Sequence, residues 1–269
     1  MRALQEGYAG RKSARVIRRR SFLLAPLALA CAQDSRPSVV VDWITTKSVP
    51  EEFARQSVVF PRAYAASPKS RRALETGRFP HAMRASDRAL SDLLRSGSPD
   101  DPGTITIVTA ESGDGGDTPL ERSIRVPLAI RWPGKLAPRI ATEVLISHID
   151  VLPTLLAWAG VEAPEVQGRD LSGLIATGRG EVPDSIYSEG RLGRPDEWRV
   201  VVRGFEKLVL NLQDEATALY NLADDPEEAI NLVRDRDHML TRDALLALAR
   251  VWRQRVGDRI DPSGLRKRD

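Results

Sequence analysis

The sequence contains a single cysteine, Cys31, among its 269 residues. Without a second cysteine, the chain has no intrachain disulfide framework and no set of thiolates to hold a zinc ion. It also lacks internal repeats, and 42% hydrophobic with 29% charged residues excludes collagen-like, coiled-coil and wholly disordered proteins. A chain of this length needs no covalent or metal staples to build a core. We therefore expect an ordinary folded protein, large enough to be an enzyme.

Long hydrophobic runs are missing as well. The apolar stretch Leu23–Ala30 is too short to cross a bilayer as a lasting helix, but it has the length of a signal-peptide core. It follows Arg18–Arg20, and residues 19–23 resemble a twin-arginine export signal. We therefore predict that residues 1–30 are a twin-arginine-like signal peptide of an exported protein. Cys31 resembles a lipoprotein acylation site, which would anchor the protein to the outer side of the inner membrane; cleavage before an unmodified Cys31 would leave it periplasmic.

The body of the chain has no excess of positive charge. The whole sequence has 40 basic and 37 acidic residues, but residues 1–30 hold seven of the basic residues and one acid, Glu6. Residues 31–269 therefore hold 33 basic and 36 acidic residues, a net charge of −3. A mildly acidic body gives no electrostatic reason to bind nucleic acid, and we expect no nucleic-acid partner.

The first part of the body has the pattern of an α/β protein. β-branched and apolar runs predict strands at residues 39–41, 105–108 and 127–132. Leucines at helical spacing predict a helix at residues 87–94. A second helix is predicted at residues 150–158, with Asp150 as its cap, Pro153 in its first turn and Gly160 after its end. This alternation predicts a parallel-rich sheet covered by helices.

After residue 180 the pattern changes to that of an antiparallel sheet. Residues 198–202 and 207–212 predict two strands of a hairpin, and residues 218–220 add an edge strand. Residues 240–256 predict a terminal helix. Its Leu245, Leu248 and Trp252 share one face, whereas Arg242, Arg250 and Arg253 are expected to be exposed.

Four stretches, taken in order, resemble the sulfatase family of the alkaline phosphatase superfamily. They lie within residues 60–81, 107–134, 150–171 and 219–232. Each is a weak signal alone, but the combination is specific. The resemblance implies an α/β fold, an alkaline-phosphatase-like sheet covered by helices. It is truncated here to a core at residues 31–180, followed at residues 181–269 by a small C-terminal antiparallel subdomain with the terminal helix.

The resemblance also implies a chemistry. In sulfatases a Cys or Ser is oxidised to formylglycine, which attacks the sulfur of a sulfate ester beside a divalent cation held by carboxylates. Matched to those motifs, Ser67 is the nucleophile precursor and Arg71 its charge stabiliser, and Asp42 and Glu111 are the metal ligands, with calcium as the expected ion. The implied substrate is a sulfated small molecule or glycan.

The sequence departs from the family pattern at several of these positions. Lys69 stands where the family has Pro, and Glu111 is followed by Ser112 instead of His or Asn. Only Asp42 represents the family's paired N-terminal aspartates, and the Lys and His expected near Glu121 are missing. The segments after residues 43 and 81 are also much shorter than in the family. We therefore expect sulfate ester hydrolysis to be reduced or lost.

Several alternatives stay open. Ser67 is also a plausible helix cap before Pro68, and Glu111 and Asp114 could be solvated residues of a glycine-rich loop. We interpret His81 and His148 as structural. The arginines at positions 71, 72, 78 and 84 form either an oxyanion site or a solvated basic face. The competing functions are therefore a sulfatase, a non-catalytic envelope protein that binds sulfated or anionic glycans, and a non-functional fragment.

Overall fold

The computed structural model describes residues 37–45, 48–67, 71–79, 95–99 and 101–258. These described residues belong to one compact unit. The predicted signal peptide, Cys31 and the predicted helix at residues 87–94 lie outside the described residues. None of the described helices is long and apolar enough to cross a membrane.

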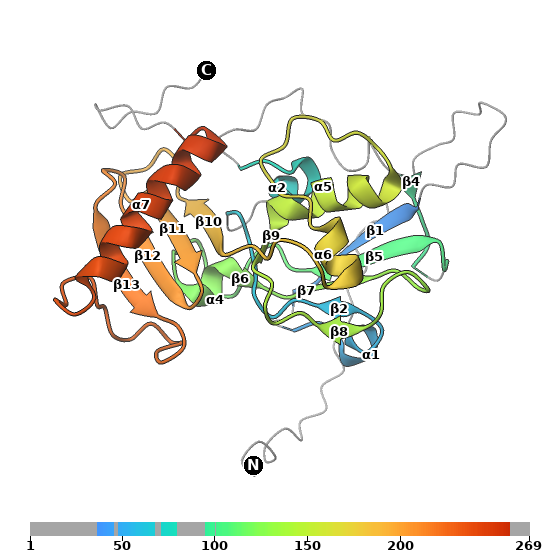
Figure 1. Ribbon diagram of the computed structural model, residues 1–269, viewed down its shortest axis with the longest axis horizontal. Helices are drawn as coiled ribbons and strands as arrows, with labels where there is room; N and C mark the ends of the chain where they lie inside the picture. Colours follow the sequence, from blue (N-terminus) through green and yellow to red (C-terminus); the bar gives the residue numbers. More distant parts are fainter. Residues whose placement is uncertain (1–36, 46–47, 68–70, 80–94, 100, 259–269) are drawn as a thin grey trace, which may run out of the picture. The chain divides into compact units, whose positions relative to one another are not determined.

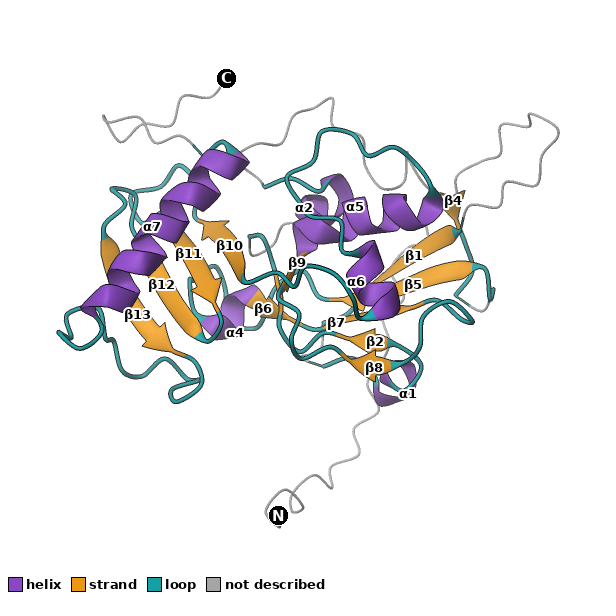
Figure 2. Cartoon of the chain, viewed as in Figure 1, coloured by secondary structure: helices purple, strands orange, loops and turns teal. Residues whose placement is uncertain are grey.

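The largest sheet has six strands in the order β4-β1-β5-β7-β2-β8 (Figure 2). Their bounds are β1 Ser38–Trp43, β2 Val58–Val59, β4 Arg95–Ser96, β5 Thr104–Thr109, β7 Leu128–Arg131 and β8 Arg139–Ile140. The strands predicted at residues 39–41, 105–108 and 127–132 are therefore confirmed. β1 is parallel to β4 and β5, but β7 is antiparallel to both of its neighbours, so the sheet is mixed.

The core of this sheet follows from its central strand. Every residue of β5 is buried, as expected for a strand covered on both faces. Helices α5, His148–Ala159, and α6, Ser172–Thr177, supply buried Leu, Ile and Val side chains to the same apolar cluster as β1, β5 and β7. The cluster fixes the strand ends from which the candidate site is built.

Helix α5 begins earlier than the sequence predicts. Ser147 is its N-cap residue, and Asp150 is the third residue of the helix, where its carboxylate accepts a hydrogen bond from the Ser147 N–H at 2.9 Å. The prediction that Asp150 is the cap is therefore wrong, because Asp150 satisfies the helix start from inside the first turn. Pro153 lies in the second turn, and Gly160 ends the helix in a left-handed conformation, as predicted.

Two smaller sheets complete the fold. A three-stranded sheet joins β3 Ala63–Tyr64 to β6 Arg125–Val126 and β9 Ile146–Ser147. The four-stranded antiparallel sheet consists of β10 Ser185–Gly190, β11 Trp198–Arg203, β12 Glu206–Leu210 and β13 Ala216–Asn221, in that order. It confirms the predicted hairpin and edge strand, although β12 ends two residues earlier than predicted. Short helices α1 Glu51–Ala54, α2 Arg71–Thr76 and α4 Glu121–Ile124 lie in the connections.

Helix α7, Met239–Val256, lies along one face of the four-stranded sheet (Figure 1). Leu245 and Trp252 are buried against the sheet and Leu248 packs beside them, as predicted. Arg242 and Arg253 are not exposed, contrary to prediction. Arg242 donates to the Val233 carbonyl at 3.3 Å, and Arg253 forms an ion pair with Asp214.

The outer edge of β13 is covered by the segment that follows it. The Asn231 side chain accepts a hydrogen bond from the Leu219 N–H and donates one to the Thr217 carbonyl. The Leu232 N–H then donates to the Leu219 carbonyl at 2.8 Å. This segment therefore occupies backbone groups that an edge strand would otherwise leave unpaired.

Candidate functional site

The candidate site is built at the carboxyl ends of β1 and β5. These strands are parallel, and their last residues, Trp43 and Thr109, are register partners. Glu111 follows β5 by two residues, and α2 begins at Arg71. Ligands commonly bind at the carboxyl ends of neighbouring strands in open α/β sheets.

Arg71, Trp43 and Glu111 meet at this edge. The Arg71 guanidinium lies 5.1 Å from the centre of the Trp43 ring, and its Nε is 3.4 Å from Glu111 Oε2. The Arg71 side chain is 54% exposed, so it combines a fixed position against the indole with access to solvent. Of the predicted site residues, the structure brings Arg71 and Glu111 together as an ion pair.

Ser67 is held in a buried segment before α2. The Ser188 hydroxyl of β10 donates to the carbonyl oxygens of Ala65 and Ala66, at 2.9 and 3.2 Å. The Glu189 N–H also donates to the Ala66 carbonyl, at 3.0 Å. Ser67 itself is 7% exposed. Residues 68–70 lie outside the described residues, so the helix-cap interpretation of Ser67 stays a prediction.

Asp42 lies apart from this group. It is exposed on β1, and because neighbouring strand residues point to opposite faces, its side chain lies on the other face of the sheet from Trp43. Among the described residues, no three His, Cys, Asp or Glu side chains gather into a metal-binding group. Calcium takes six to eight oxygen ligands, and the described carboxylates at this edge do not fit that requirement. We therefore derive no chemical step through a cation.

The glycine-rich loop after Glu111 has a packing role. A Cβ on Gly113 would lie 2.0 Å from the Arg122 carbonyl oxygen, and one on Gly115 would lie 2.2 Å from Ser123 Oγ. The loop therefore folds tightly back on α4, which requires glycine at both positions.

His148 packs against Trp43, one of the residues of the candidate site. It is fully buried at the start of α5, and its ring meets the Trp43 ring edge-on with centroids 6.0 Å apart. Thr109 Oγ1 donates to the Pro127 carbonyl, so it accepts from the His148 Nε2–H at 3.1 Å. Burial lowers the pKa of His148 to about 4, which keeps the imidazole neutral at pH 7. The structural interpretation of His148 is consistent with these contacts.

Of the predicted arginine cluster, Arg78 does not belong to an exposed basic face. Arg78 is buried, and its guanidinium donates to the Glu165 carbonyl at 2.7 Å. Arg72 is exposed on α2, and Arg84 lies outside the described residues. Arg71 is therefore the member of the set that the structure places at the candidate site.

Sequence analysis missed a cluster of buried charged side chains around Lys207. Lys207 Nζ of β12 lies 2.6 Å from Glu228 Oε1 and 3.6 Å from Glu121 Oε2. The Tyr64 hydroxyl donates to Glu121 Oε1 at 2.7 Å, and Glu228 Oε2 accepts from the Glu121 N–H. Burial and the Glu121 charge raise the pKa of Tyr64. The lysine within the apolar pattern of β12 indicated a buried charge. Its partners could not be identified from the sequence, because Glu121 and Glu228 are distant from it along the chain.

Comparisons with known proteins match sulfatases. The family model described as N-sulphoglucosamine sulphohydrolase, C-terminal, matches residues 118–250. Arylsulfatase A from Bos taurus is 36% identical over 106 residues, 39% of this chain and 17% of that protein. Endo-4-O-sulfatase from Bacteroides thetaiotaomicron is 31% identical over 98 residues, 34% of this chain and 19% of that protein. The matches thus cover less than a fifth of either relative.

A solved structure shares the fold. It is a complex of a protein with its substrate D-glucosamine-2-N,6-O-disulfate, with a TM-score of 0.53 and 20% sequence identity. The match covers 58% of this chain and 35% of the other. At this identity the likeness concerns the fold, an alkaline-phosphatase-like α/β core with a C-terminal antiparallel sheet.

Proposed function

We propose that this chain is a shortened member of the sulfatase family, as its matches to sulfatases support, and that it binds a sulfated small molecule or glycan at the carboxyl ends of β1 and β5. Hydrolysis of a sulfate ester is the ancestral reaction, and it is reduced or lost in this chain. The substrate of the structural neighbour, a disulfated glucosamine, supports a sulfated sugar as the ligand.

The position of Arg71 carries this proposal. A guanidinium presents several N–H donors in one plane and binds tetrahedral oxyanions through paired hydrogen bonds. The contact with the Trp43 ring holds the Arg71 guanidinium at this edge, while more than half of its side chain stays open to solvent. Glu111 competes with any anion for this guanidinium, so the ion pair sets the affinity for sulfate.

Hydrolysis would require Ser67 as the formylglycine precursor and a divalent cation, with calcium held by Asp42 and Glu111. Asp42 lies on the opposite face of the sheet from Trp43, and Glu111 pairs with Arg71. This arrangement supports anion binding more than metal-assisted hydrolysis. It favours the second candidate function, a non-catalytic protein of the cell envelope that binds sulfated or anionic glycans.

Binding of a sulfated disaccharide, measured by calorimetry on the full chain, tests the proposal. We expect Arg71→Ala to weaken binding about tenfold or more, because it removes charge-assisted hydrogen bonds. The matched control, Arg72→Ala, removes an exposed arginine from the next position of α2 and should leave binding unchanged. Glu111→Gln should strengthen binding. Equal loss in the two arginine variants would contradict a site at Arg71.

Turnover of an aryl sulfate with added calcium separates the two functions. Turnover that Ser67→Ala abolishes would establish a working sulfatase, and Glu111→Gln would then reduce the rate. Binding that survives Ser67→Ala without turnover supports the non-catalytic protein.

We also propose that the N-terminal segment directs export, to the periplasm or, with an acylated Cys31, to the outer side of the inner membrane. Cell fractionation of the wild type and Cys31→Ser tests both. Release of the variant from the membrane fraction would support the anchor, and a cytoplasmic wild type would refute export.

A further inference from the structure

Arg71 and Glu111 present opposite charges side by side at the carboxyl ends of β1 and β5. Arg71 Nε and Glu111 Oε2 are 3.4 Å apart, which is longer than a normal hydrogen bond. The two side chains are 54% and 35% exposed, so solvent reaches both of them. The site therefore offers a ligand a cation and an anion at once.

This ion pair keeps most of its hydrogen-bonding capacity for a ligand. A guanidinium has five N–H donors, and a carboxylate has two acceptor oxygens with about four lone-pair sites. The Trp43 ring, 5.1 Å from the Arg71 guanidinium carbon, positions that group through a cation–π contact, which needs none of its N–H donors. An ion pair between exposed side chains changes an equilibrium by a factor of about five or less, so a ligand that binds both groups can displace it.

The two neighbouring charges select the charges of the ligand. An anion that binds Arg71 lies beside Glu111 and is repelled by it, and a cation at Glu111 is repelled by Arg71. A ligand with one positive and one negative group satisfies both side chains. Its sulfate oxygens accept hydrogen bonds from the guanidinium, and its ammonium group donates to the carboxylate.

The short separation of the two side-chain ends also sets the spacing of the groups on the ligand. Because Nε and Oε2 are 3.4 Å apart, the sulfate and the ammonium must lie close together, as they do on adjacent carbons of a sugar ring. Groups at opposite ends of a ring reach both partners only if Arg71 and Glu111 move apart.

We propose that Arg71 and Glu111 bind a zwitterionic sulfated amino sugar, with the sulfate ester at Arg71 and a free ammonium group on the adjacent carbon at Glu111. This assignment rests on the proposed function, because it defines the ligand class of the same site. Glu111 then provides specificity: it repels ligands that carry only negative charge and attracts those that also carry an ammonium group.

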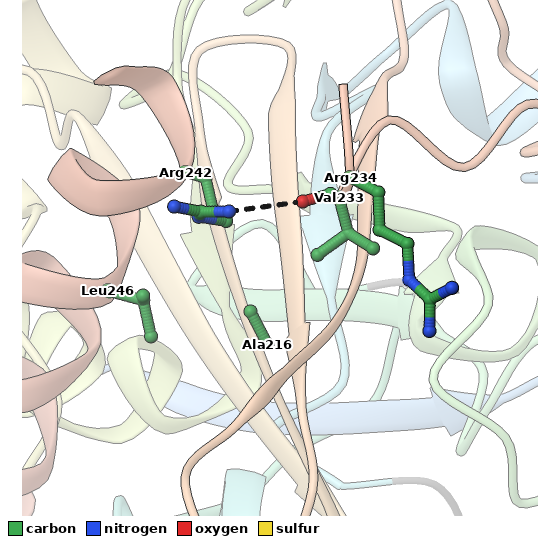
Figure 3. Close-up of a pocket in the computed structure, with 5 residues that line it drawn as sticks. All are labelled: Ala216, Val233, Arg234, Arg242 and Leu246. Atoms are coloured by element: carbon green, nitrogen blue, oxygen red, sulfur yellow. Dashed lines mark hydrogen bonds between the residues drawn. The ribbon is translucent and has the colours of Figure 1, made fainter. Parts of the chain in front are cut away.

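The cavity between β13 and α7 lacks this combination of charges. It has a volume of about 340 Å³ and is lined by Ala216, Val233, Arg234, Arg242 and Leu246 (Figure 3). None of these five described residues is acidic, and Arg242 already donates to the Val233 carbonyl and to Asp243 Oδ1. Arg234 is exposed in this cavity, so Arg234→Ala is a control for binding away from Arg71.

Nuclear magnetic resonance titration of the ¹⁵N-labelled full chain, followed at the Trp43 indole N–H, tests the assignment on the wild type. Glucosamine 3-sulfate carries an ammonium group next to its sulfate, and N-acetylglucosamine 3-sulfate carries the same sulfate without the ammonium. Glucosamine 6-sulfate has both groups on distant carbons. We expect glucosamine 3-sulfate to bind about tenfold more tightly than the other two sugars, because it makes one more charge-assisted hydrogen bond.

Glu111→Gln should change the affinities for the two 3-sulfates in opposite directions. It keeps the shape of the side chain and removes its charge, so glucosamine 3-sulfate should bind about tenfold more weakly. N-acetylglucosamine 3-sulfate should bind up to about fivefold more tightly, because Arg71 loses its competing partner. Arg71→Ala should weaken the binding of both sugars, and Arg234→Ala should weaken neither.

The outcomes separate this assignment from the proposed function. If both 3-sulfates bind through Arg71 but Glu111→Gln shifts their affinities in the same direction, Glu111 does not bind the ammonium group, and only the sulfate site at Arg71 stands. Equal affinity of the wild type for the two 3-sulfates has the same meaning. Equal affinity for glucosamine 3-sulfate and 6-sulfate would contradict the adjacent spacing. If neither sugar binds, or Arg71→Ala leaves binding unchanged, the assignment and the proposed function are both wrong.

Discussion

Replacing Lys207 by methionine should strongly destabilise the protein. The ammonium group of Lys207 is fully buried between Glu228 and Glu121, and both carboxylates are nearly inaccessible to solvent. Methionine fills a similar volume but leaves two buried carboxylates without a cation. Removing one partner of a buried ion pair costs about 3–5 kcal/mol, a large share of a total stability of about 5–15 kcal/mol.

This loss should be visible in both chemical and thermal unfolding. At roughly 2–4 °C per kcal/mol for a protein of this size, the melting temperature should fall by roughly 6–20 °C. The matched control is Lys135→Met, at an exposed lysine, which should unfold within about 0.5 kcal/mol of the wild type.

A double variant isolates the charge from the packing. Glu228→Gln keeps the shape of that side chain and removes one of the two uncompensated charges, so the double variant of Lys207→Met and Glu228→Gln should recover part of the lost stability. If Lys207→Met unfolds with the stability of Lys135→Met, the cluster does not contribute as reasoned. If the second substitution only adds to the loss, charge is not the cause.

Two further predictions concern pH and backbone packing. Because the folded-state pKa of His148 is lowered to about 4 from an unfolded value of about 6.5, its contribution to stability is complete above pH 6.5 and is lost as the pH falls toward 4, by about 3 kcal/mol in all. His148→Gln should flatten this part of the curve of unfolding free energy against pH, and an unchanged slope would refute the assignment. Gly168→Ala should destabilise by about 1–3 kcal/mol in denaturant titration, because the new Cβ would lie 1.9 Å from the Ile149 carbonyl oxygen. Gly173→Ala, with open space around the new Cβ, is its control and should cost far less.

The strands that sequence analysis predicts are those with a strong local signal. Residues 105–108 alternate Ile with Thr and Val, and the structure buries all of them in β5. The two-residue strands β2, β3 and β9 carry no pattern long enough to detect, and their pairing depends on distant partners. The direction of β7 could not be predicted from the sequence either, because its antiparallel pairing with β5 depends on the path of the chain between them.

The start of α5 shows how two good local signals can compete. Ser147 and Asp150 are both typical cap residues, and Pro153 favours a helix that starts close before it. The structure begins the helix at His148, because that position buries the imidazole under Trp43 and beside Thr109. Tertiary packing therefore determined the first residue of α5, which local helix-capping preferences did not.

The candidate site was predicted in part. The motif spacing identified Arg71 and Glu111 as site residues, and the structure places them close together. The spacing could not show that the two side chains form an ion pair. Nor could it show that β10, more than a hundred residues later, holds the segment before Ser67 through the Ser188 hydroxyl. Such contacts arise only from the folded chain.

The covering of β13 by Asn231 and Leu232 has a consequence for self-association. Proteins polymerise through β-structure when an uncovered edge strand of one molecule pairs with that of another. Here the Asn231 amide and the Leu232 N–H already occupy the Thr217 and Leu219 backbone groups that such pairing would use. The segment thus prevents strands of other molecules from pairing with β13 at these backbone groups.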